Sequence, residues 1–147
     1  MTQLSEHFTL EEFTYSETAE SCGIDNTPDD AVIANLTRLA GVMEEVRRIC
    51  VDYPVTVTSG YRCLALNEAI GGATESAHLH GLGCDFIIPD YGSPHDVCLA
   101  IEPYIDVLGV DQLIWEYGDW VHLGLSEGEP RCQCLTIDEL GTSEGFV

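Results

Sequence analysis

The sequence of 147 residues contains no lysine, and its five basic residues, all arginines, stand against 26 aspartates and glutamates. The formal net charge at pH 7 is therefore -21. Nucleic-acid backbones attract proteins through clusters of Lys and Arg, so this charge balance excludes a nucleic-acid-binding protein. The acidity is typical of a highly soluble or salt-adapted surface, and attraction of metal cations or of a basic partner is the functional alternative.

Long apolar runs are also missing. No stretch approaches the roughly 20 consecutive apolar residues that a membrane helix needs. The opening segment, Met1 to His7, lacks the basic and then apolar pattern of a secretory signal. We therefore expect a protein that does not insert into membranes and is synthesised in the cytoplasm without a signal peptide.

Paired cysteine motifs are absent as well. Seven cysteines, an odd number, are spread along the chain without a CxxC pair, which excludes a zinc ribbon and a thioredoxin motif. Several lie on apolar stripes, where Cys packs as a small hydrophobic residue, so we expect buried free thiols kept in a reducing compartment. Cys132 and Cys134, two residues apart, are the alternative, a minor metal or redox site.

The chain length fits one domain, and an apolar content of 45% suffices for one packed core. We predict a single domain over residues 1–147, with an N-terminal helix and loop over 1–28 and a polar, mobile tail over 138–147. Predicted helices come first and paired strands later. This order favours an α+β fold in which a mainly antiparallel sheet packs against helices.

The first predicted helix begins at Phe8–Phe13, where Thr9 and Glu12 form a capping box and Phe8 and Phe13 a hydrophobic staple. It ends near Ser16, and a loop covers residues 21–28. Apolar residues at alternating steps of four and three predict the main core helix over 29–50, with its start marked by Thr27, Pro28 and Asp30. Period-two alternation and apolar runs bounded by turn residues predict strands over 54–58, 84–88, 112–116, 120–125 and about 132–137. Two further helices are predicted over 63–70 and from 93 to Pro103.

Three segments carry polar residues that a packed core does not need: 59–62, 76–85 and 116–122. Gly81 and Gly83 allow the chain to turn sharply between His78 and the strand of Asp85, so that both side chains can reach one ion. Alternation places Asp85 and His122 on the sides of their strands that face away from the core. Two imidazoles and one carboxylate are a common ligand set for catalytic Zn²⁺, which keeps a fourth position open for water.

The same residues leave several alternatives open. His80 can replace His78 as a ligand, and the histidines can also be core residues of a domain without metal. Arg62 is assigned to the substrate or to the charged oxygen of the reaction, or else forms a structural ion pair. Glu116 is the first choice for the general base, and Asp119 is the alternative. Both acids also fit simple turn or hairpin-cap positions.

An ordered set of motifs carries a resemblance to a known family. The motifs are Ser59-Gly60-Tyr61-Arg62 with Asn67 and Gly71-Gly72, then Ser76-x-His78-x-x-Gly81-x-Gly83-x-Asp85, then Glu116 and Trp120-Val121-His122. Together they resemble the zinc D-alanyl-D-alanine carboxypeptidase family. That family includes phage endolysins that cut L-alanyl-D-glutamate bonds, and it shares its fold with the hedgehog signalling domain. The opening segments Phe8–Phe13 and Gly23–Pro28 resemble its short phage or prophage branch, so the resemblance covers roughly residues 4–137.

The resemblance implies a hedgehog/DD-peptidase-like fold with Zn²⁺ ligands at His78, Asp85 and His122, and it places Arg62 and Ser76 near the substrate. Glu116 stands where the hedgehog-like members have their water-activating glutamate, whereas Asp119 matches the acid-x-x-His spacing of other branches.

The implied activity is zinc-dependent hydrolysis of amide bonds in peptidoglycan stem peptides, of the D-Ala-D-Ala carboxypeptidase or the L-Ala-D-Glu endopeptidase type. We expect a monomer that acts at the bacterial cell wall, whether phage-encoded or virion-associated. The alternative is a non-catalytic zinc-bearing binding or virion-associated module of the same fold.

Overall fold

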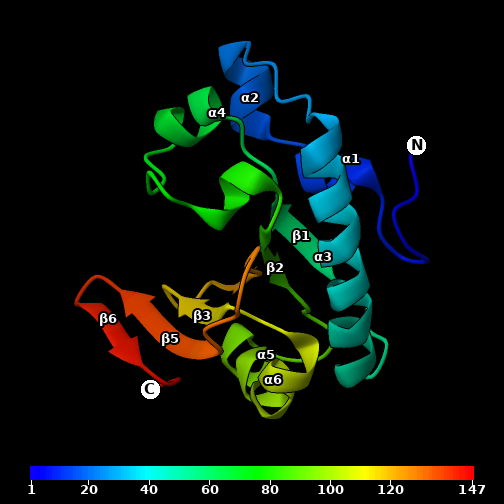
Figure 1. Ribbon diagram of the computed structural model, residues 1–147. Coiled ribbons are helices and arrows are strands. Elements are labelled where there is room, and N and C mark those ends of the chain that lie inside the picture. The colour runs from blue at the N-terminus through cyan, green and yellow to red at the C-terminus, as the bar shows by residue number, and fades with distance from the viewer.

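The computed structural model describes all residues from 1 to 147 and contains six strands, six α-helices and two short 3-10 helices (Figure 1). The strands are β1 (Thr56–Ser59), β2 (Gly83–Ile87), β3 (Gln112–Glu116), β4 (Trp120–Gly124), β5 (Gln133–Asp138) and β6 (Gly141–Glu144). The helices are α1 (Leu10–Thr14), α2 (Glu17–Cys22), α3 (Asp30–Ile49), α4 (Leu64–Ala69), η1 (Ala77–His80), α5 (Pro94–Ile101), η2 (Glu102–Tyr104) and α6 (Ile105–Leu108).

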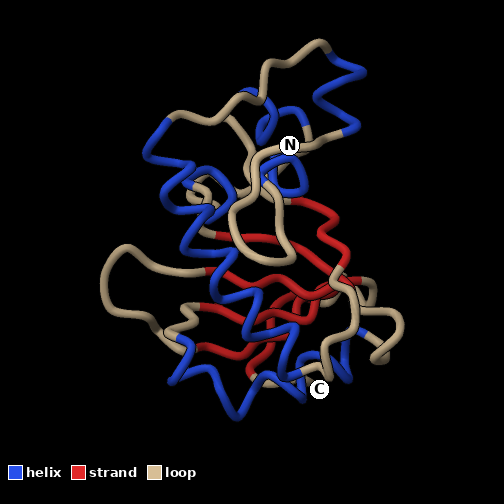
Figure 2. Tube along the Cα trace, turned by 90° about the vertical axis from the view of Figure 1, so that its right-hand side faces the viewer, coloured by secondary structure: helices blue, strands red, loops and turns tan.

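All strands join one sheet in the order β1-β2-β4-β3-β5-β6. Every neighbouring pair is antiparallel except β3 and β5, which run parallel. Figure 2 shows the long helix α3 running in front of the strands, so this helix covers one face of the sheet. The predicted α+β class with a mainly antiparallel sheet is therefore confirmed.

Helix α3 forms because its apolar residues make a single stripe. The stripe is buried from end to end and belongs to one core cluster with Phe86 and Leu123 of the sheet. The predicted span 29–50 is close to the observed one, but the helix is capped by Asp29, which accepts a hydrogen bond from the backbone N–H of Val32 at 2.9 Å. None of the helices combines the length and the apolar character that crossing a membrane requires.

The N-terminal helix α1 is capped by Thr9 and has the predicted hydrophobic staple, but the capping box is incomplete, since only Thr9 accepts a hydrogen bond. Thr9 accepts a hydrogen bond from the backbone N–H of Glu12, and the rings of Phe8 and Phe13 pack with their centroids 5.8 Å apart. The following helix α2 lies partly in a segment predicted to be loop. It buries only Ala19, so it has too few apolar residues to produce a helical stripe in the sequence.

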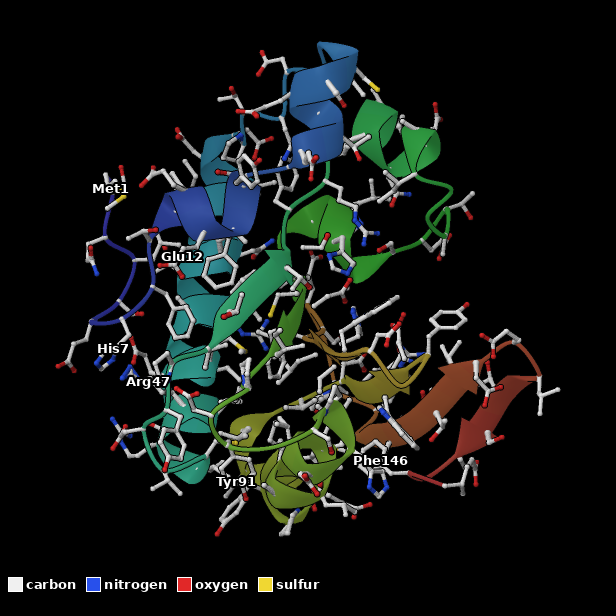
Figure 3. All side chains as sticks on the ribbon, turned by 180° about the vertical axis from the view of Figure 1, so that it is seen from behind. Met1, His7, Glu12, Arg47, Tyr91 and Phe146 are labelled. Carbon is white, nitrogen blue, oxygen red and sulfur yellow. The ribbon has the colours of Figure 1, made fainter.

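The C-terminal segment 138–147 is not the mobile tail that its polarity predicts. Residues 141–144 form β6 and pair with β5, and the half-buried Phe146 packs against the core cluster. Phe146 is labelled in Figure 3. Its carbonyl oxygen lies 3.3 Å from Nε2 of His95 on α5. The prediction fails because all four residues of β6 are exposed, so the strand depends on backbone pairing and carries no hydrophobic alternation.

All seven cysteines are free thiols, and Cys50, Cys84 and Cys98 are buried in the core. Burial raises the pKa of Cys50 to about 11, so this thiol stays protonated at neutral pH. Cys132 and Cys134 do not belong to the one group of residues placed to hold a metal, so the metal alternative predicted for them is not supported.

One glycine is essential for the contact between α1 and the end of β1. A Cβ atom on Gly60 would lie 2.3 Å from the carbonyl oxygen of Phe13, so no other residue fits without moving the backbone. The neighbouring N–H of Tyr61 donates to that same oxygen at 2.6 Å. Gly41, in the middle of α3, has nothing within 4 Å of its Cβ position.

Replacing Gly60 and Gly41 by alanine should change the free energy of unfolding in opposite directions. Gly60→Ala should lower the free energy of unfolding by about 1–3 kcal/mol, because the added methyl overpacks a backbone contact. Gly41→Ala should raise it by about 0.5–1 kcal/mol, because alanine restricts the unfolded chain and favours the helix. Urea unfolding followed by circular dichroism measures both values, and equal stability of the two variants would contradict this packing.

Candidate metal centre

Two of the predicted ligands share the face of the sheet that is turned away from α3. Side chains alternate along a strand, so Phe86 of β2 and Val121 of β4 enter the core while Asp85 and His122 point to the other side. Asp85 and His122 are also direct partners in the register between β2 and β4. The carboxylate and the imidazole are therefore neighbours on adjacent central strands.

The third candidate, His78, reaches this face from the short helix η1. Ser76 accepts a hydrogen bond from the backbone N–H of His78 at the start of η1, and Gly81 ends it with a φ of 73°. A Cβ atom on Gly81 would lie 2.9 Å from the backbone of Val32, so this turn packs tightly against α3. The chain can then return at once into β2 with His78 lying over Asp85.

The three side chains lie within coordination distance of one ion. Nε2 of His78 is 3.2 Å from Oδ1 of Asp85, and Nδ1 of His122 is 3.0 Å from the same oxygen. One ligand atom from each residue lies within 4.8 Å of the others, and all three residues are buried. His80 is exposed and lies outside this group, and its carbonyl accepts a hydrogen bond from Asn35. The structure thus brings together the three residues predicted as ligands and leaves the alternative outside.

The hydrogen bonds of His78 show that a cation fits between these groups. Its Nδ1–H donates to the carbonyl oxygen of Gly60 at 2.7 Å, because a carbonyl can only accept. Nε2 then presents a lone pair to the Asp85 carboxylate. Burial lowers the pKa of His78 against the raising effect of Asp85, which disfavours a second proton on the ring. Two electron-pair donors facing each other in a buried site are the arrangement that a bound metal ion requires.

Asp85 remains ionised despite its burial. Burial alone raises the pKa of this carboxyl group, but the neighbouring imidazoles of His122 and His78 outweigh it and hold the pKa well below its usual range. Its two oxygens have different neighbours, since Oδ1 faces both imidazoles and Oδ2 lies 3.4 Å from Nη2 of Arg62. The candidate ligand is therefore negatively charged at neutral pH.

Arg62 is held beside this group by residues that the sequence reasoning did not assign to it. Its Nε donates to Oγ of Ser59 at 3.2 Å, and its Nη1 donates to Oδ1 of Asn67 at 3.3 Å. Asn67 is 2% exposed, and its Nδ2 donates to the carbonyl of Ala73. Burial lowers the pKa of Arg62, while Asp85 and Glu116 raise it. The closeness of Ser59 and Asn67 to Arg62 in the sequence is the signal that could have identified this support.

The two candidate acids of the hairpin lie in different environments. Glu116 is the direct partner of Trp120 across β3 and β4, so it shares the face of His122 and lines the cleft above the metal residues. Burial raises the pKa of Glu116, as does Asp85, while the charges of His122 and Arg62 oppose the shift. Asp119 is exposed in the turn between the strands and does not line the cleft.

The metal residues form part of the wall of a cleft of about 690 Å³. Ser76, Gly71 and Gly72 also line this cleft, as do Gln112 and Arg131. Arg131 is paired with Asp111 at 2.7 Å, whereas Arg62 lies next to the metal residues. The cleft is large enough for a segment of peptide and brings it past the buried group.

Comparison with protein families places these residues in a known context. The model of the family Peptidase M15 matches residues 6–124, a span that includes His78, Asp85, His122, Arg62 and Glu116. Comparison with curated proteins gave no match. Because the family match covers most of the sequence and all three candidate ligands, the chain belongs to the Peptidase M15 family.

Proposed function

We propose that this protein is a zinc peptidase that hydrolyses amide bonds in the stem peptides of bacterial peptidoglycan. One observation carries the proposal: His78, Asp85 and His122 are buried with their ligand atoms within 4.8 Å of one another at a peptide-sized cleft. The membership of the Peptidase M15 family supports a peptidase. The substrate class follows from the motifs that resemble zinc carboxypeptidases and endolysins of the cell wall.

His78, Asp85 and His122 would hold the ion. Their two nitrogens and one oxygen match the ligand set of catalytic zinc sites, which reserve the remaining position for a small molecule. When bound, zinc polarises a carbonyl group and lowers the pKa of a water molecule to about 7. The carbonyl of Gly60 keeps the His78 ring in the required orientation through its bond to Nδ1.

Glu116 and Arg62 would act on the reacting groups from two sides of the cleft. Glu116 accepts the proton of the attacking water and later passes it to the leaving amine, for which its raised pKa is suited. Arg62, fixed by Ser59 and Asn67, stabilises the negative charge that develops on the oxygen of the scissile carbonyl. Ser76 lies in the same cleft and contacts the peptide beside the scissile bond.

The first prediction concerns activity and the bond that is cut. Purified protein supplied with zinc should release new amino termini from peptidoglycan, lose this activity with a chelator and regain it with added zinc. Mass spectrometry of the digested muropeptides separates loss of a terminal D-Ala from cleavage between L-Ala and D-Glu. A protein that binds zinc and peptidoglycan but releases no amino termini would be a binding module, and the proposal would be wrong.

A second prediction distinguishes the two candidate bases. Glu116→Gln keeps the size of the side chain but cannot accept the proton, so kcat should fall by about 10²- to 10⁴-fold. The zinc content should not change, because Glu116 is not among the proposed ligands.

Asp119→Asn is the matched control for this variant. Its side chain lies in the exposed turn, so kcat should stay within about twofold of the wild-type value, as for other surface changes. The assignment would have to be reversed if Asp119→Asn abolished turnover and Glu116→Gln did not.

A further inference from the structure

The two tryptophans of the chain share an unusual property. The indole N–H of Trp115 and that of Trp120 are both buried, and neither has a hydrogen-bond partner. Buried donors are nearly always paired in folded proteins, so each unpaired one needs an explanation. Trp115 packs against His95, with ring centroids 4.5 Å apart, on the side of the sheet away from the cleft. Trp120 is the one that lines the cleft.

The hairpin places the Trp120 indole next to Glu116. The two residues are direct partners across β3 and β4, and such partners have their Cβ atoms about 5 Å apart on the same face. Tyr117 and Gly118 form the turn with φ angles of 53° and 69°, and the N–H of Asp119 donates to the carbonyl of Glu116 at 3.0 Å. This tight turn holds the backbones of Glu116 and Trp120 opposite each other.

The ring of Trp120 is also restrained by its neighbour in the turn. The rings of Tyr117 and Trp120 lie with their centroids 5.6 Å apart and their planes tilted by 41°. The Tyr117 ring therefore packs against the indole within the turn.

We propose that the Trp120 indole N–H is the positioning donor for the Glu116 carboxylate, holding one of its oxygens so that the other faces the attacking water. The role of Glu116 as the base rests on the proposed function, whereas the contact between the two side chains does not. In the structure the indole N–H has no hydrogen-bond partner, and Glu116 is the direct cross-strand neighbour of Trp120. Contacts of this kind often tighten only when the site is loaded.

The electrostatics of Glu116 agree with this pairing. Burial raises the pKa of the carboxyl group, and Trp120 is among the groups that lower it, together with His122 and Arg62. A hydrogen bond to a charged acceptor is stronger than one between neutral groups, so a single indole N–H can fix the orientation of a half-buried carboxylate.

A pair of phenylalanine variants tests the effect on turnover. Trp120→Phe removes the N–H and keeps an aromatic ring, so kcat should fall about 10- to 100-fold, the range expected for losing a hydrogen bond to a charged group. KM should stay within about twofold, and the zinc content should not change. Trp115→Phe removes the other unpaired N–H outside the cleft and should leave kcat and KM unchanged. A Trp120→Phe variant with wild-type kcat would overturn the positioning role.

A magnetic resonance experiment tests the contact without any turnover. The ¹⁵N-labelled wild-type protein, with its two tryptophans, should show two indole N–H signals, assigned by means of the phenylalanine variants. Glu116→Ala should shift the Trp120 signal and leave the Trp115 signal in place, while Asp119→Ala should move neither.

An unshifted Trp120 signal in Glu116→Ala would overturn the proposal even if the protein is an active peptidase. A shifted signal in a protein without peptidase activity would support the contact and refute only the proposed function. The experiment therefore tests the contact between Trp120 and Glu116 independently of the proposed peptidase function.

Discussion

A buried carboxylate facing two imidazoles is the feature on which the rest of this structure depends. Asp85 is 6% exposed and stays ionised, and both histidines approach the same carboxylate oxygen. An ionised group is expensive to bury unless an opposite charge compensates it. Arg62 lies beside only one of the two oxygens, so the side facing the histidines is the place for a cation.

The fold meets this constraint because the two faces of the sheet have different surroundings. The core face packs against the apolar stripe of α3, and the other face carries Asp85, His122 and Glu116. Gly60 links the packing of α1 to the candidate site, because it packs against the backbone of α1 while its carbonyl orients His78. The geometry of the candidate site is thus tied to the packing of the N-terminal helix.

Sequence patterns predicted the parts of the fold that have strong periodicity. The stripe of α3 and the staple of α1 are visible in the sequence, and both are present in the structure. The ligand set was predicted from strand alternation and from the glycines beside His78, and the structure brings those three residues together. Elements without a periodic apolar pattern were missed, as the helix α2 and the strand β6 show.

The choice between Glu116 and Asp119 required more than spacing. Both acids lie close to His122 in the sequence, and only the register of the hairpin shows that Glu116 shares its face while Asp119 occupies the turn. Ser59 and Asn67 stand close to Arg62 in the sequence, but neither was assigned to it, because their hydrogen bonds to the guanidinium depend on how the chain turns between the end of β1 and α4.

The central claim is that one metal ion binds between His78, Asp85 and His122 with only nitrogen and oxygen ligands. Because the chain also has seven free cysteines, zinc has a competing class of ligand in the same protein. Zinc X-ray absorption spectroscopy of the loaded protein measures this directly. We predict one zinc per chain, a first shell of nitrogen and oxygen atoms that includes two imidazoles, and loss of the ion in His122→Ala. Sulfur in the first shell, or full zinc retention in His122→Ala, would contradict the account.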